Sequence, residues 1–237
     1  MVNLSNQKRE KNLRGGLFKA LLILIFFISA SFICAFGFYV FALKKNISNY
    51  NPVRSYLTKL QSGKKYSLSD EGRDNYWLGS AKPKIMIYEF ADFNCPLSKN
   101  SFSKLREISV KYKNEIKIIF KDFPVYDDSI NLAMAGRCAG EQGLFWPMHD
   151  RLYQNQNNFD SSNIQEISSL AVTVGVDQSR FDSCMENKKY LSDIQKDYAD
   201  GQKVEASGTP TWLINGYKIS GDIPYNLLVQ LIEELRK

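Results

Sequence analysis

The feature that most constrains this chain is an uncharged, apolar run of 24 residues from Ala20 to Leu43. As a helix rising 1.5 Å per residue, this run would be about 36 Å long, enough to cross a hydrocarbon core of about 30 Å. Five basic residues precede it, so the positive-inside rule predicts a cytoplasmic N-terminus and a body outside the cytoplasm. The alternative is a cleaved signal peptide, whose apolar region is usually shorter, at about 7 to 15 residues.

The basic character of the chain is confined to its N-terminal end. The 237 residues carry 31 basic and 25 acidic side chains, a net charge of +6. Residues 1–45 hold seven of the basic side chains and one acidic one, which leaves 24 of each in the other 192 residues. Because a neutral body has no electrostatic footprint for a phosphate backbone, we do not expect nucleic acid as a partner.

Composition divides the chain into four segments. We expect a cytoplasmic tail at 1–19, the transmembrane helix at 20–43, a polar tether with a short N-terminal element at 44–80, and one folded domain at 81–237. The last segment is long enough to bury a single hydrophobic core. This arrangement predicts a single-pass protein of the cytoplasmic membrane whose folded domain is periplasmic or extracellular.

The folded segment combines strand patterns with helical spacing. Apolar runs and an Asn-Gly turn predict strands at 85–90, 116–120, 211–214 and 217–219. Helical spacing predicts helices at about 96–108, 130–138, 145–153, 164–172, 180–185, 190–204 and 227–235. The order of strand, helix, strand, helical block, hairpin and helix indicates an α/β fold with an all-helical block at about 125–205.

Cys95 stands between the first strand and the helix that follows it, in the sequence Cys95-Pro96-Leu97-Ser98. The free N–H groups and the dipole at the start of a helix stabilise an anion, so a thiol placed there ionises more readily. Proline suits the first helical turn, where its missing N–H leaves no hydrogen bond unmade. Cys95 is therefore a candidate nucleophile, although a lone cysteine is also commonly a small buried apolar residue.

Three segments together resemble the membrane-anchored, DsbA-like branch of the thioredoxin superfamily, over about residues 76–235. They are residues 88–96, 141–150 and 207–216, which read YEFADFNCP, EQGLFWPMHD and SGTPTWLING. The resemblance implies a thioredoxin-like fold with a helical insertion, in agreement with the order of elements. It also implies a protein disulfide oxidoreductase that has a redox-active centre and needs no cofactor.

Carried over residue by residue, the resemblance makes Cys95 the attacking cysteine and Pro96 the residue after it. Glu89 matches the family's buried acid, which helps to move protons at the site, and the alternative is a strand-end carboxylate in water. Thr209 and Pro210 match the cis-proline loop, whose backbone would pair with an extended substrate. Without that role, Pro210 would simply end a loop.

The sequence departs from the family at Ser98. The family motif is Cys-Pro-x-Cys, whereas serine occupies the last position here, so no internal disulfide can form at the site. Cys95 can still form a mixed disulfide with a substrate, and we expect the Ser98 hydroxyl to hydrogen-bond the thiolate. This chemistry favours isomerase or reductase action on exported proteins with thiols or disulfides, completed by a small thiol or a membrane redox partner.

Ser98 leaves several other interpretations open. The chain is alternatively a DsbA-type oxidoreductase that lacks its resolving cysteine, an engineered trapping variant, or a non-catalytic substrate-binding or chaperone module. A glutathione-conjugating relative is a more distant alternative, because some DsbA-like folds use a serine-containing site. Its known members lack the anchor.

Cys138 and Cys184 both fall on apolar faces of expected helices in the insertion. Because the compartment outside the cytoplasm is generally oxidising, we favour a structural disulfide between them over two buried free thiols. The single histidine, His149, is expected to pack in the core. One histidine and four scattered cysteines lack the spacing of a zinc site, and no glycine-rich phosphate loop is present, so neither a metal nor a nucleotide is expected.

Overall fold

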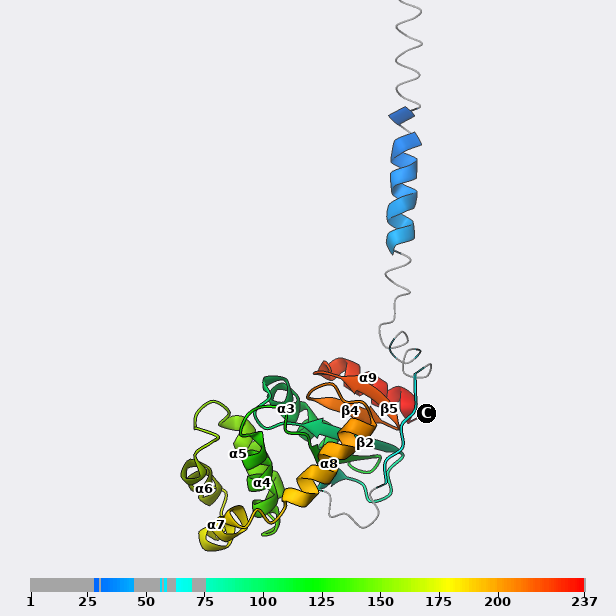
Figure 1. The fold of residues 1–237 in the computed structure, drawn as a ribbon. Helices are drawn as coiled ribbons and strands as arrows, with labels where there is room; N and C mark the ends of the chain where they lie inside the picture. Colours follow the sequence, from blue (N-terminus) through cyan, green and yellow to red (C-terminus); the bar gives the residue numbers. More distant parts are fainter. Residues whose placement is uncertain are drawn as a thin grey trace, which may run out of the picture. The chain divides into compact units, whose positions relative to one another are not determined.

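The computed structural model describes residues 28–29, 31–44, 56, 58, 63–69 and 76–236. The chain divides into two compact units, Met1–Pro52 and Val53–Lys237. Figure 1 shows the fold of the second unit, in which helices pack around a central sheet.

In the first unit, residues 31–44 form a helix that exposes its large apolar side chains, among them Phe32 at 74% and Phe38 at 75% exposure. Most of the expected membrane helix before this point, residues 20–27 and 30, lies outside the described residues. Among the residues that the structure describes, no helix has both the length and the hydropathy needed to cross a bilayer.

In the part of the chain that the structure describes, five strands form one mixed sheet in the order β1-β3-β2-β4-β5. Their bounds are β1 Trp77–Gly79, β2 Ile85–Ala91, β3 Ile116–Asp122, β4 Thr211–Ile214 and β5 Tyr217–Ser220. The central strands β2 and β3 are parallel, whereas β1 pairs antiparallel with β3, and β4 pairs antiparallel with both β2 and β5. The parallel β2–β3 connection carries α3 as its crossover, which brings the C-terminal end of β2 directly to the start of that helix.

Helices cover both faces of this sheet. On one face, α3 (Pro96–Lys111) and α9 (Tyr225–Leu235) share a buried cluster with strand residues, including Leu105, Leu231 and Ile87. On the other face, Phe90 and Leu213 pack against Val204 at the end of α8 (Leu191–Lys203). The sheet is thus buried on both sides, which explains why β2 and β3 read as nearly continuous apolar runs rather than alternating ones.

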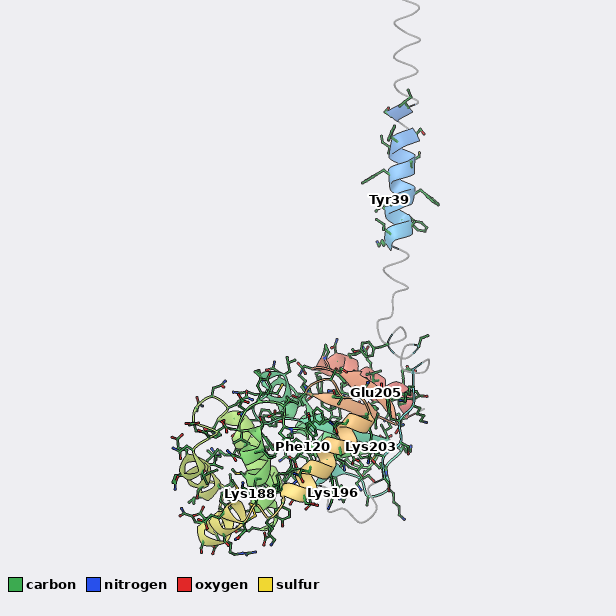
Figure 2. All side chains as sticks on the ribbon, in the orientation of Figure 1. Tyr39, Phe120, Lys188, Lys196, Lys203 and Glu205 are labelled. Atoms are coloured by element: carbon green, nitrogen blue, oxygen red, sulfur yellow. A yellow bond between two sulfur atoms is a disulfide. The ribbon has the colours of Figure 1, made fainter. Side chains whose placement is uncertain are left out.

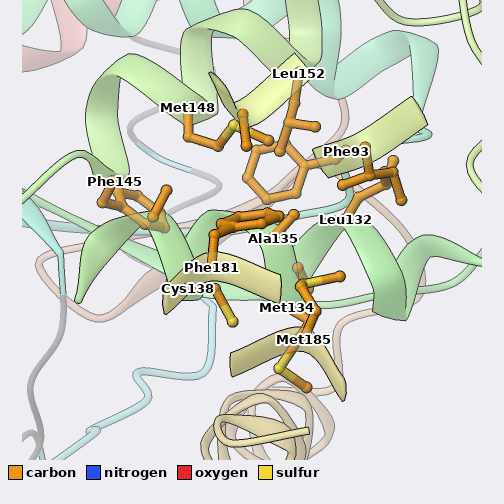
Figure 3. Packing of buried hydrophobic residues seen from close by; sticks show 14 of the residues in the cluster. Phe93, Leu132, Met134, Ala135, Cys138, Phe145, Met148, Leu152, Phe181 and Met185 are labelled. Atoms are coloured by element: carbon orange, nitrogen blue, oxygen red, sulfur yellow. The ribbon is translucent and has the colours of Figure 1, made fainter. Parts of the chain in front are cut away.

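The remaining helices form the insertion between β3 and β4. They are α4 (Ser129–Gly140), α5 (Phe145–Gln154), α6 (Ile164–Val172) and α7 (Gln178–Glu186), and with α8 they surround a second apolar cluster. Figure 3 shows side chains of this cluster, among them Phe181 and Cys138. Within it, the sulfur atoms of Cys138 and Cys184 are bonded at 2.02 Å, with Cα atoms 5.7 Å apart.

A buried ionic network joins α4 and α8 to the end of β3. Lys121 has no exposed surface, and its Nζ lies 3.1 Å from Asp197 Oδ1 and 3.6 Å from Asp200 Oδ2. Arg137 Nε donates to Asp122 Oδ2 at 2.5 Å, and its terminal nitrogen contacts Asp197. Burial raises the pKa of Asp122 to about 6 despite the neighbouring Arg137. Opposite charges are therefore paired where the insertion meets the sheet.

The outer edge of β5 is partly covered by residues 63–69. Lys65 forms a β-bridge with Tyr217, and the Tyr66 N–H donates to the Gly216 carbonyl at 2.8 Å. The Lys64 amine and the Tyr66 hydroxyl also bond the carboxylate of Glu205, which follows α8 and is labelled in Figure 2. These contacts fix the segment against the sheet.

Candidate active site

Cys95 is the N-cap residue of α3, with φ −79° and ψ 121°, and Pro96 begins the helix. The Cys95 carbonyl accepts the Lys99 N–H at 3.0 Å, which closes the first helical turn. No acidic residue occurs in that first turn, so the positive end of the helix dipole is not neutralised from within α3. Cys95 is 3% exposed, with its sulfur at the helix start.

The loop before β4 lies directly against this thiol. Cys95 Sγ donates to the backbone carbonyl of Thr209 at 3.1 Å, across 114 residues of sequence. The Thr209-Pro210 peptide bond is cis. Thr209 Oγ1 is buried and has no hydrogen-bond partner among the described residues. The structure therefore brings Cys95, Pro96, Thr209 and Pro210 together.

Ser98 lies one turn into α3 and is completely buried. Its hydroxyl oxygen accepts the backbone N–H of Asp92 at 3.5 Å. Among the described residues, the Ser98 hydroxyl makes no hydrogen bond to Cys95 Sγ, which donates to the Thr209 carbonyl. Since Asp92 belongs to the turn before Cys95, Ser98 holds the turn rather than the thiol.

Asp92 organises the turn that carries Cys95, and sequence reasoning assigned it no role. Its Oδ1 accepts the Asn94 N–H at 2.7 Å, and its Oδ2 accepts the N–H groups of Val125 and Tyr126 at 2.7 and 3.0 Å. The carboxylate thus satisfies three backbone donors from two loops, at Asn94 in one and at Val125 and Tyr126 in the other. A single acid in the turn gives no sequence signal of such a long-range role.

Glu89 lies on β2 beneath α3 and is 2% exposed. Burial raises its pKa to about 8, against a hydrogen bond from Ser101 that favours the charged form. Ser101 Oγ lies 3.1 Å from Glu89 Oε1 and 2.8 Å from the Ser98 carbonyl. The charge of Asp222, which pairs with Lys104, also raises the pKa of Glu89. Glu89 is therefore a buried acid and not the solvated strand-end carboxylate of the alternative interpretation.

Three exposed apolar side chains stand in the segments that carry or adjoin Cys95. Leu97, Val125 and Tyr126 are each about half exposed, at 47%, 46% and 51%. The charge that Cys95 carries as a thiolate raises the pKa of Tyr126, and a hydrogen bond to the same sulfur adds to this effect. The phenol of Tyr126 is therefore close to the sulfur, an approach that the sequence did not reveal because Tyr126 lies 31 positions away.

The other residues singled out in the sequence lie in the insertion. Cys138 and Cys184 pair with each other, and Cys95 is a free thiol. His149 is buried among aromatic rings, with ring centroids 5.0 Å away at Trp146 and 5.1 Å at Phe120. Burial lowers the pKa of His149. Within the described residues, no three histidine, cysteine or acidic side chains are grouped so that they could hold a metal ion.

Fold and site together define a class. They are those of a thioredoxin-like α/β protein with an extra helical domain. The defining features are the central sheet with parallel β2 and β3, the cysteine at the start of the crossover helix, the cis-proline loop against its sulfur and the all-helical insertion.

The chain belongs to the thioredoxin family described by the model Thioredoxin_4, which matches residues 72–234.

Solved structures share this fold. A thioredoxin-like oxidoreductase from Silicibacter pomeroyi DSS-3 superposes with a TM-score of 0.63 at 21% identity, covering 72% of this chain and 98% of that one. Alpha-DsbA1 from Wolbachia pipientis gives 0.63 at 20% identity, covering 69% and 91%. Oxidised BdbD from Bacillus subtilis gives 0.62 at 21% identity, covering 72% and 96%. The fold of the second unit is thus that of DsbA-like proteins.

Curated relatives are similar over about two thirds of this chain but are much longer. A protein named Na(+)/H(+) antiporter NhaA 3, from Salinispora tropica, is 29% identical over 161 residues, which are 67% of this chain and 24% of that protein. Na(+)/H(+) antiporter NhaA 1 from Mycolicibacterium vanbaalenii is 24% identical over 158 residues, 65% of this chain and 25% of the relative. The chain therefore spans about a quarter of the length of these relatives.

Proposed function

We propose that this chain catalyses thiol–disulfide exchange on exported proteins through Cys95 alone. The observation that carries the proposal is the position of Sγ at the start of α3, 3.1 Å from the Thr209 carbonyl. A substrate strand laid against this loop would bring its own sulfur next to the only cysteine at the site. Pro96 fixes the helix start, and Glu89 is the acid that exchanges protons beneath it.

The reaction follows from having one sulfur. The Cys95 thiolate attacks a substrate disulfide, one new S–S bond forms, one S–S bond breaks, and the departing thiolate takes up a proton. Ser98 has no sulfur to expel the bound substrate, so release needs a second thiol from the substrate, a small molecule or a membrane partner. This requirement supports isomerase or reductase action over the oxidation of reduced chains.

The location that fits this chemistry is outside the cytoplasm, beside the membrane. Residues 31–44 form a helix with exposed phenylalanines, and the uncharged run extends back to Ala20 behind five basic residues. A helix that is apolar all round is suited to lipid. We infer a membrane-anchored protein with its domain on the periplasmic or extracellular side, where a structural Cys138–Cys184 disulfide would persist.

A second candidate function is a non-catalytic substrate-binding or chaperone module. One observation favours it: Cys95 is only 3% exposed, while Leu97 in the first turn of α3 and Val125 and Tyr126 in the loop held by Asp92 are each about half exposed. Exposed apolar side chains there would bind unfolded chains without any covalent step.

Adduct formation tests the proposal. The reduced full-length protein, with Cys34→Ala to remove the other free thiol, is incubated with a modest excess of an oxidised small thiol and mapped by mass spectrometry. We expect a mixed disulfide on Cys95 that reductant reverses, and none in the matched Cys95→Ala variant. Absence of the adduct would reject the nucleophile. An adduct without any recovery of activity from a scrambled substrate in the presence of thiol would favour the binding module.

A further inference from the structure

The helical insertion contributes the hydroxyl of Tyr153 to the hydrogen bonds around Cys95. Tyr153 of α5 is 1% exposed, and its hydroxyl donates to the backbone carbonyl of Asp92 at 3.5 Å. The same carbonyl accepts the backbone N–H of Cys95 at 3.0 Å. Tyr153 and Cys95 are therefore joined through one peptide group, although they are 58 positions apart in sequence.

Ser98 connects this tyrosine to the other side of the site. The pKa of Tyr153 lies well above its ordinary value because of burial, and a hydrogen bond with the Ser98 hydroxyl acts in the opposite direction. The Ser98 carbonyl in turn accepts Ser101 Oγ at 2.8 Å, and that oxygen lies 3.1 Å from the carboxyl of Glu89. Buried hydroxyl and peptide groups thus link Glu89, Ser101, Ser98, Tyr153 and the Asp92 turn.

The number of available protons decides which group donates and which accepts in this network. Ser101 has one hydroxyl proton and two acceptors within reach, the Ser98 carbonyl and Glu89. Both contacts are satisfied at once when Glu89 is protonated and donates to Ser101 Oγ while Ser101 donates to the Ser98 carbonyl. A pKa of about 8 means that Glu89 holds this proton at neutral pH. The site therefore contains an acid ready to protonate a departing thiolate.

We propose that Tyr153 is a positioning residue for proton transfer in thiol–disulfide exchange, with its hydroxyl linking the Ser98–Ser101–Glu89 hydrogen bonds to the turn that holds Cys95. The inference rests on the proposed function and extends it by assigning the insertion a part in the reaction. Tyr153 does not give up its own proton to solvent; it keeps Ser98 and the Asp92 peptide aligned while charge moves.

The step balances without any added oxidant. The Cys95 thiolate forms a bond to one substrate sulfur, the substrate S–S bond breaks, and the second substrate sulfur leaves with the electron pair. Glu89 supplies the proton that neutralises this leaving thiolate and later regains one from solvent. The surrounding charged groups are Asp92 and Cys95 at the turn and the Asp222–Lys104 pair beside Glu89. Glu89, Asp92 and Cys95, when they carry their negative charges, each raise the pKa of Tyr153.

A comparison of leaving groups tests the proposal. The full-length Cys34→Ala protein is mixed with an aromatic disulfide, whose leaving thiolate is weakly basic, and with an aliphatic disulfide, whose leaving thiolate needs a proton. We expect Tyr153→Phe to slow the aliphatic reaction at pH 7 by about tenfold to a hundredfold, at or below the usual contribution of a positioned general acid. The aromatic reaction should change by less than about twofold, because it needs no proton.

Matched variants separate this role from packing. Glu89→Gln should show the same selectivity, and the double variant should lose no more than either single one, because both act on one path. Tyr112→Phe is the control: Tyr112 is a buried tyrosine of the same unit, and its hydroxyl bonds Glu233 at 2.7 Å. It should leave both rates unchanged. If Tyr153→Phe does not fold, Ser98→Ala carries the test, with the same selectivity expected.

Two results would overturn the proposal. Equal slowing of both disulfides by Tyr153→Phe would show a purely structural role, and unchanged rates would show no role. A parent protein that reacts with neither disulfide would instead reject thiol–disulfide exchange by Cys95 itself, so the two failures are distinguishable.

Discussion

We expect Glu89→Gln to lower the stability of the fold at acidic pH and to raise it at basic pH. In the folded protein, burial raises the pKa of Glu89 from 4.5 to about 8. The unfolded chain therefore releases the proton first as pH rises, and ionisation favours unfolding. The stability penalty grows from about pH 4.5 and levels off above about pH 8, once the folded protein also ionises.

The size of this effect follows from the two pKa values. Each unit of difference between folded and unfolded states corresponds to about 1.36 kcal/mol, so Glu89 destabilises the fold by about 4 kcal/mol at pH 8 and by less than about 0.5 kcal/mol at pH 4.5. Glutamine carries no such penalty, but its buried amide group lacks a full set of partners, which costs about 1 to 3 kcal/mol at either pH. The variant should thus be less stable than the parent at pH 4.5 and more stable at pH 8.

Urea unfolding of the full-length chain in mild detergent measures both differences. Trp77, Trp146 and Trp212 all lie in the second unit, so their fluorescence reports its unfolding alone. The control is Glu186→Gln at an exposed site, which should give the same small difference at both pH values. A Glu89→Gln difference that stays constant between pH 4.5 and pH 8 would refute a buried acid with a raised pKa.

Three further changes test other parts of the structure. Ser98→Cys should form a reducible disulfide with Cys95, read as loss of alkylation that reductant restores, and two persistently free thiols after mild oxidation would argue against the thioredoxin-like site. Arg137→Met removes the ion-pair partner of the buried Asp122 carboxylate and one of the two cations beside Asp197, so it should lower the free energy of unfolding by about 3 to 5 kcal/mol, while exposed Arg180→Met should lower it by under about 1 kcal/mol; equal losses would contradict the network. Cys138→Ala with Cys184→Ala opens a link across 46 residues and should lower stability by about 4 kcal/mol, with Cys95 adduct formation retained; an unchanged urea midpoint would mean that the link carries no stability.

Local patterns in the sequence located most of the elements. The expected strand at 211–214 is β4 and the expected helix at 164–172 is α6, without a shift at either end. The sequence does not predict β1, because its three residues, one of them a glycine, are too few to show an alternation of apolar and polar side chains. It exists because Trp77 and Leu78 pair with Ile119 and Ile118 of β3. Such a strand depends on tertiary contacts rather than local propensity.

The candidate site also contains residues that the sequence predicts and residues that it does not. Cys95, Pro96 and the cis-proline loop stand in recognisable segments, so their meeting could be expected. Tyr153 and Asp92 act through hydrogen bonds to backbone groups of distant loops, and no residue pattern encodes which peptide a phenol or carboxylate will reach. Ser98 is an example: its position in the motif predicts a hydrogen bond to the Cys95 sulfur, whereas its hydroxyl oxygen accepts the Asp92 N–H.

The segment at 63–69 has a consequence for the association of one molecule with another. An uncovered edge strand offers free N–H and C=O groups to any other extended chain, and it is a common starting point for aggregation. Here the Lys65–Tyr217 bridge and the Tyr66 N–H occupy part of the β5 edge. A fragment that begins at β1 would lose this cover. Residues 63–69 thus also reduce the tendency of the domain to associate with itself through the β5 edge.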